Sequence, residues 1–72
     1  MGNFMQFNSS IFLAVGQIWF PSSQDDYTLE IVKLSKKNAK VKQIETGEIY
    51  YHELNGPDGF VDYLIENRYS LK

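Results

Sequence analysis

The feature that most constrains this fold is the alternation of apolar and polar side chains across residues 27–52. Around Leu29 and Ile31 the apolar side chains recur at every second position, which is typical of a strand with one buried face. The alternation shifts where Val32 follows Ile31 directly. This shift predicts a β-bulge that bends the strand strongly, or a strand covered on both faces.

Two polar segments divide the same stretch into three strands. Residues 35–38 are typical of a turn, and residues 45–48 contain Gly47, which suits the left-handed backbone of a tight hairpin. Between the turns, Ala39 and Val41 alternate with lysines. The stretch therefore predicts an antiparallel β-meander.

Length and composition set limits on the rest. A chain of 72 residues is enough for one small domain, which buries only about 60% of its unfolded surface. The chain has no cysteine, which excludes disulfides and thiolate metal sites and fits a cytoplasmic location. A net charge of −2 gives no overall attraction to nucleic acid or to an anionic membrane.

Residues 1–10 are polar and predict a tail or an extra edge strand, ahead of a single domain over residues 11–72. Residues 15–20 predict the first full strand, with Gly16 at a bend or at a close approach of another backbone segment. Residues 11–14 suit either a strand or a helical turn. This apolar stretch is too short to span a bilayer.

A closing helix is predicted over about residues 57–67. Pro57 suits a first helical position, and an apolar stripe would pack on the sheet through Phe60, Val61, Leu64 and Ile65. Asp58 and Asp62 would lie near the positive end of the helix dipole, and Arg68 near the negative end.

Most of the basic charge lies in one segment. Of seven basic residues, five fall within residues 33–42, namely Lys33, Lys36, Lys37, Lys40 and Lys42. Lysines on a hairpin with tyrosines nearby would suit single-stranded nucleic acid. Outward lysines on an edge strand also prevent aggregation without any ligand.

Aromatic and acidic residues offer a second candidate surface. The residues that would form a protein-binding patch are Trp19, Phe20, Asp25, Asp26, Tyr27 and Tyr50. Core packing is the alternative for Trp19, and solvated turn positions are the alternative for the two aspartates.

No catalytic or metal-ligand motif is recognisable. His52 is the only histidine, and it is either a general base or an imidazole on the outer face of a strand. We predict no enzyme activity, no cofactor and no metal.

The order of a VGQIW strand, an acidic loop, LEIVKL, VKQIETGEIYYHE and a closing FVDYLIENRY helix resembles small SH3-like barrels. It looks like those encoded by phages and other mobile elements, and more distantly like Tudor and KOW domains. The resemblance implies a mainly β fold of about five strongly bent antiparallel strands with a C-terminal helix, whose loops bind a peptide, a protein surface or nucleic acid.

From these observations we expect a non-enzymatic, cytoplasmic protein-binding module, as a monomer or small homo-oligomer. Its expected setting is a phage or mobile-element accessory protein that modulates or inhibits a host factor, such as one of defence. The alternative is RNA or single-stranded DNA binding through residues 33–42.

Overall fold

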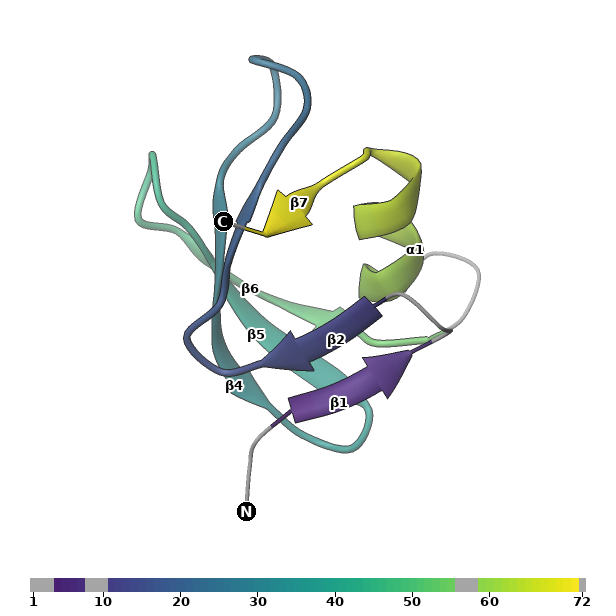
Figure 1. Cartoon of the computed structure of the whole chain (residues 1–72). Coiled ribbons are helices and arrows are strands. Elements are labelled where there is room, and N and C mark those ends of the chain that lie inside the picture. Colours follow the sequence, from purple (N-terminus) through teal and green to yellow (C-terminus); the bar gives the residue numbers. More distant parts are fainter. Residues whose placement is uncertain (1–3, 8–10, 56–58, 72) are drawn as a thin grey trace.

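The computed structural model describes residues 4–7, 11–55 and 59–71 (Figure 1). Five strands form one antiparallel sheet in the order β6-β5-β4-β3-β7, and β1 and β2 form a separate two-stranded sheet. A mainly β domain with one short C-terminal helix is therefore confirmed. The elements are β1 (Phe4–Phe7), β2 (Ile11–Ala14), β3 (Ile18–Phe20), β4 (Leu29–Leu34), β5 (Asn38–Gln43), β6 (Ile49–Glu53), α1 (Phe60–Glu66) and β7 (Ser70–Leu71).

The predicted meander corresponds to β4, β5 and β6. Ile31 pairs with Val41, but the next pair is Lys33 with Lys40, so the register shifts at the predicted bulge. Gly47 has φ of 79° in the β5–β6 turn, as the hairpin requires. The bulge turns Lys33 to the same face as Lys40, and this arrangement positions the surface described below.

The prediction of one strand over residues 15–20 was wrong. Val15 and Gly16 form a turn, with φ of 94° at Gly16, and the strand begins only at Ile18. Backbone hydrogen bonds from Gly16 N to Ile31 O (2.8 Å) and from Ile31 N to Gln17 O (3.0 Å) hold this turn against β4. The glycine therefore separates two short strands instead of bending one long strand.

The N-terminal segment contributes a strand. β1 pairs antiparallel with β2, from Phe4 opposite Ala14 to Phe7 opposite Ile11. Residues 11–14 are thus extended, and the helical alternative for them was wrong. In Figure 1 this hairpin lies across the bent sheet formed by β4, β5 and β6.

Helix α1 is shorter than the predicted helix over residues 57–67. It begins at Phe60 because Gly59, its N-cap, is extended at φ −72° and ψ 165°. Pro57 and Asp58 lie outside the described residues, while Asp62 falls in the first turn and Arg68 lies beyond the last turn. Phe60, Val61 and Leu64 are buried, as predicted, whereas Ile65 remains 44% exposed.

The core lies between α1 and the inner face of the sheet. Alternate residues of β4 and β5 enter it, together with Leu13 from β2 and Leu54 after β6. The buried set is Leu13, Trp19, Leu29, Ile31, Ala39, Val41, Leu54, Phe60, Val61, Leu64 and Tyr69. Among the described residues, no helix has the length and apolar character that crossing a membrane requires.

Candidate functional site

The outer face of β4 and β5 carries three lysines, Lys33, Lys40 and Lys42. Because side chains alternate along a strand, burial of Ala39 and Val41 places Lys40 and Lys42 on the opposite face. The bulge places Lys33 directly opposite Lys40, and Tyr51 lies opposite Lys40 on the other side. One row across three strands thus contains two cations and an aromatic ring.

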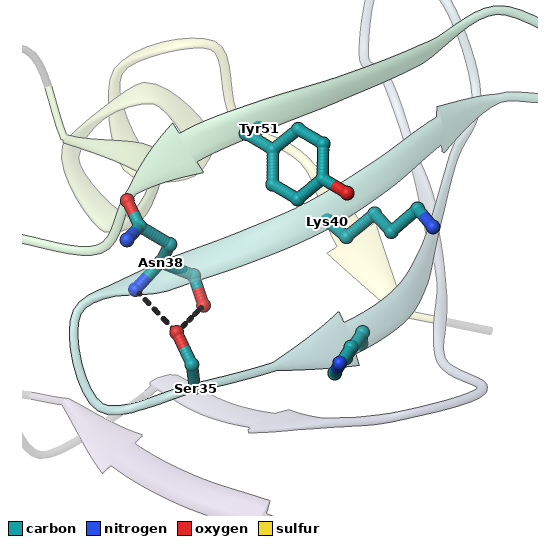
Figure 2. Close-up of a pocket in the computed structure, with 5 residues that line it drawn as sticks. Ser35, Asn38, Lys40 and Tyr51 are labelled. Atoms are coloured by element: carbon teal, nitrogen blue, oxygen red, sulfur yellow. Dashed lines mark hydrogen bonds between the residues drawn. The ribbon is translucent and has the colours of Figure 1, made fainter.

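A hollow of about 200 Å³ opens on this face (Figure 2). Its lining residues are Lys33, Ser35, Asn38, Lys40 and Tyr51, and we refer to it as the lysine hollow. Two hydrogen bonds close the β4–β5 turn beside the hollow. Ser35 N donates to Asn38 O at 2.9 Å, and Asn38 N donates to Ser35 Oγ at 3.2 Å. The hollow therefore combines two ammonium groups with a hydroxyl and an amide on a fixed turn.

Tyr51 is the most exposed large apolar side chain of the described residues, at 71%. The Lys40 Nζ lies over its ring, 5.8 Å from the centroid, within the range of a cation–π contact. Figure 2 shows both side chains on the same face, from neighbouring strands. In Figure 2 the ring of Tyr51 leans from β6 toward β5, so the contact forms on the β5 side of Tyr51.

β6 also has a free edge. It is the terminal strand of the sheet, and among the described residues only β5 pairs with it. Leu54 N donates to Lys37 O at 2.8 Å, so these two residues form a hydrogen-bonded pair of the β5–β6 ladder. Bonded and non-bonded pairs alternate along an antiparallel ladder, and the pair of Lys40 with Tyr51 is three positions away. Tyr51 is therefore in a non-bonded pair. The N–H and C=O groups of Ile49, Tyr51 and Glu53 therefore point away from β5 and can accept another strand.

A second hollow, of about 220 Å³, lies at the end of the same hairpin. It is lined by Lys36, Lys37, Glu53 and Asn55. Lys36, Lys37 and Glu53 are all exposed. The positive surface of the lysine hollow thus continues toward the end of β6.

Trp19 does not contribute to the predicted aromatic and acidic patch. Trp19 is only 4% exposed, and its Nε1 donates to Gln17 Oε1 at 3.1 Å, so its ring belongs to the core. Phe20 is partly buried, and Asp25 and Asp26 lie in the β3–β4 loop, which projects from the body in Figure 1. The core alternative therefore holds for Trp19.

Tyr27 and Tyr50 are the exposed aromatics of that predicted patch, at 44% and 42%. The Tyr50 hydroxyl donates to Glu48 Oε1 at 2.6 Å, and this bond raises the pKa of Tyr50. Nearby, the Glu45 carboxylate accepts hydrogen bonds from Thr28 N (2.8 Å) and Thr28 Oγ1 (2.6 Å), which lower the pKa of Glu45. This side of the domain is acidic, in contrast to the lysine hollow.

His52 faces the inner side of the sheet and not its outer face. Its ring stacks on Phe60 at 5.5 Å and on Tyr63 at 6.4 Å between centroids, and burial lowers its pKa. The outer-face alternative for His52 was therefore wrong. Within the part of the chain that is described, no three His, Asp or Glu side chains are grouped closely enough to hold a metal ion.

Tyr51 is not among the residues that the sequence predicts to bind a partner. The alternation within residues 49–53 indicates two opposite faces, but it does not say which face is covered or which neighbour lies beside β6. The structure distinguishes Tyr51 from Tyr50 because Tyr51 pairs with Lys40 on the outer face of the sheet. It also places β6 at the edge of the sheet.

Comparisons with family models, with curated proteins and with solved structures found no match for this chain.

Proposed function

We propose that this protein is a non-enzymatic protein-binding module that accepts an extended segment of its partner as an additional strand along β6. The observation that carries the proposal is the free edge of β6 beside Tyr51. In strand addition, backbone hydrogen bonds supply affinity and alternate side chains supply specificity. The outward N–H and C=O groups of Ile49, Tyr51 and Glu53 would make these bonds.

The architecture supports an SH3-like interpretation of this module. The five-stranded sheet with its bulge in β4 and the short C-terminal helix agree with the arrangement that the resemblance implies. The phage or mobile-element barrels that the sequence resembles motivate the setting we propose. In that setting the protein is a cytoplasmic accessory factor that modulates or inhibits a host protein.

A proline at position 49 tests the edge specifically. Ile49 is the first residue of β6 and its N–H points outward, so proline there removes an edge donor and leaves the β5–β6 ladder intact. Peptides selected from a random display library on the wild-type domain should lose at least about tenfold in affinity for Ile49→Pro. They should retain affinity for the control Ile49→Thr, which keeps the N–H.

Amide hydrogen exchange provides a second measurement that does not depend on a variant. On peptide binding, the amides of Tyr51 and Glu53 should become protected, whereas that of Tyr50 is already bonded to β5 and should change little. Protection confined to the β3–β4 loop, or equal binding to both Ile49 variants, would reject strand addition.

Single-stranded nucleic acid is the second candidate ligand. The observation that favours it is the combination of Lys33, Lys40 and the exposed Tyr51 in one hollow, since lysines neutralise phosphates and aromatic rings stack on bases. Binding of a 12-nucleotide deoxythymidine or uridine strand is measured by fluorescence anisotropy at several salt concentrations. Replacing Lys36, Lys37, Lys40 and Lys42 by Glu should abolish it, and binding that is independent of salt or of these residues would reject this candidate.

A further inference from the structure

Lys33 and Lys40 lie directly opposite each other on neighbouring strands. Like charges at such positions repel and destabilise a sheet. Ser35 and Asn38, which complete the turn beside them, add a hydroxyl and an amide but no negative charge. Among the described residues no carboxylate forms an ion pair with Lys33 or Lys40, and two such cations in a polar hollow are suited to binding an anion.

The hollow is next to the free edge of β6. Neighbouring strands lie about 4.8 Å apart, so a strand added to β6 would be about two spacings from β5. Lys40 contacts the ring of Tyr51, and its flexible four-carbon stem lets the ammonium group swing across this ring toward the edge. An acidic side chain on the added strand, opposite Tyr51, can then pair with the ammonium group of Lys40.

We propose that the lysine hollow binds the carboxylate of an Asp or Glu side chain in the segment that β6 accepts. The inference rests on the proposed function and specifies the partner as an acidic extended segment. Lys40 forms the ion pair, and Lys33 adds a second positive charge behind it. Lys36 and Lys37 lie near the end of β6, but Glu53 lines the same hollow, so the attraction for an acidic side chain is centred on Lys33 and Lys40.

The volume of the lysine hollow and the net charge of the chain favour a single carboxylate side chain as the ligand over a larger anion. At about 200 Å³ the hollow is smaller than the roughly 300–1,000 Å³ of typical small-molecule sites. The chain carries nine acidic residues against seven basic ones, so the body repels a long polyanion. One or two carboxylates on an otherwise neutral strand experience this repulsion only weakly.

The test uses three synthetic nine-residue peptides of alternating Thr and Val whose central residue is Glu, Gln or Lys. Affinities are measured by NMR titration of the ¹⁵N-labelled domain. We expect the Glu peptide to bind at least about tenfold more tightly than the Gln peptide, and the Lys peptide to bind most weakly. In the double variant Lys33→Gln, Lys40→Gln, affinity for the Glu peptide should fall to the level of the Gln peptide. Affinity for the Gln peptide should be the same in the variant and in the wild type.

The salt dependence of binding also distinguishes the Glu peptide from the Gln peptide, without any variant of the domain. Affinity for the Glu peptide should fall between 50 and 500 mM NaCl, whereas affinity for the Gln peptide should stay constant, because salt screens the ion pair. Equal binding of the Glu and Gln peptides overturns this inference and leaves strand addition standing. If neither peptide binds the edge of β6, strand addition fails as well.

Other occupants of the same edge are separate outcomes. A 12-nucleotide oligonucleotide that displaces the Glu peptide and binds more tightly would assign the hollow to nucleic acid and overturn the inference. Analytical ultracentrifugation tests for a dimer. A dimer that the Ile49→Pro variant no longer forms would assign the edge to a second copy of this chain and would also overturn the inference.

Discussion

The hydroxyl group of Tyr69 donates a hydrogen bond of 2.7 Å to the backbone carbonyl of Tyr27 and so joins the segment after α1 to the segment before β4. Tyr69 is 8% exposed, and burial, followed by the nearby Tyr63 hydroxyl, raises its pKa. Tyr69→Phe should lower the free energy of unfolding by about 1 kcal/mol, because the carbonyl loses its partner. Urea denaturation measures this loss.

The matched control is Tyr50→Phe, which removes a hydroxyl that donates to the exposed Glu48 carboxylate. Its loss should be smaller, because water replaces that bond. An equal or larger loss for Tyr50→Phe would show that the Tyr69 hydroxyl does not stabilise this junction.

Arg68 ends α1 in a conformation that suits glycine better. Its φ is 55°, its N–H donates to Ile65 O at 3.1 Å, and Tyr69 N donates to Leu64 O at 3.0 Å. These two bonds define a Schellman motif, in which glycine is the usual residue at the left-handed position. Arg68→Gly should therefore raise the free energy of unfolding by about 0.5–1 kcal/mol, since relief of strain exceeds the entropy cost of glycine.

Thermal and urea unfolding of Arg68→Gly and Arg68→Ala separate strain from charge. Alanine removes the same charge but keeps the side-chain clash of the left-handed region, so it should give no gain. A gain of equal size for alanine would attribute the effect to the charge.

The meander was predictable because its signals are local. Two adjacent apolar residues, Ile31 and Val32, are enough to indicate the bulge. A single residue, Gly47, is enough to indicate the turn. The lysines of residues 33–42 were also found from their local density. Each of these features is encoded within a few residues of where it acts.

Other features depend on contacts between distant segments. Trp19 is buried because Gln17 bonds its indole nitrogen and the core closes over its ring, and neither is visible in the alternation of residues 15–20. α1 begins late because Gly59 packs against the backbone of Leu54. The importance of Tyr51 comes from the order of the strands, which leaves β6 at the edge.

Gly59 is a position where any side chain should be destabilising. A Cβ there would lie 2.8 Å from the carbonyl oxygen of Leu54 and 2.8 Å from the carbonyl carbon of Asn55. Both are backbone atoms that cannot rotate away, so Gly59→Ala should lower the free energy of unfolding by about 1–3 kcal/mol. Circular dichroism during urea denaturation measures the change.

The control for Gly59 is Gly47→Asn. Gly47 has φ of 79° with nothing near its missing Cβ, and asparagine tolerates this backbone region well. The asparagine variant should lose much less stability than Gly59→Ala. If the two losses are similar, backbone contact at Gly59 is not the reason for its glycine.

His52 should make stability depend on pH below about 6.5. Burial beside Phe60 and Tyr63 lowers its pKa from 6.5, so the unfolded chain binds the proton more readily than the folded one. The free energy of unfolding should therefore fall as the pH decreases from 6.5 through the folded-state pKa, and the His52 contribution should be fully present above 6.5.

The variant His52→Phe keeps a ring against Phe60 but cannot take up a proton, so it should lack this pH dependence. Carboxylates such as Glu45, whose pKa is lowered, also weaken the fold at acidic pH in both proteins. The informative quantity is thus the difference between wild type and variant, measured by urea denaturation from pH 5 to pH 8. A constant difference across this range would mean that His52 titrates equally in the folded and unfolded chains, whereas a difference that grows below pH 6.5 follows from its burial.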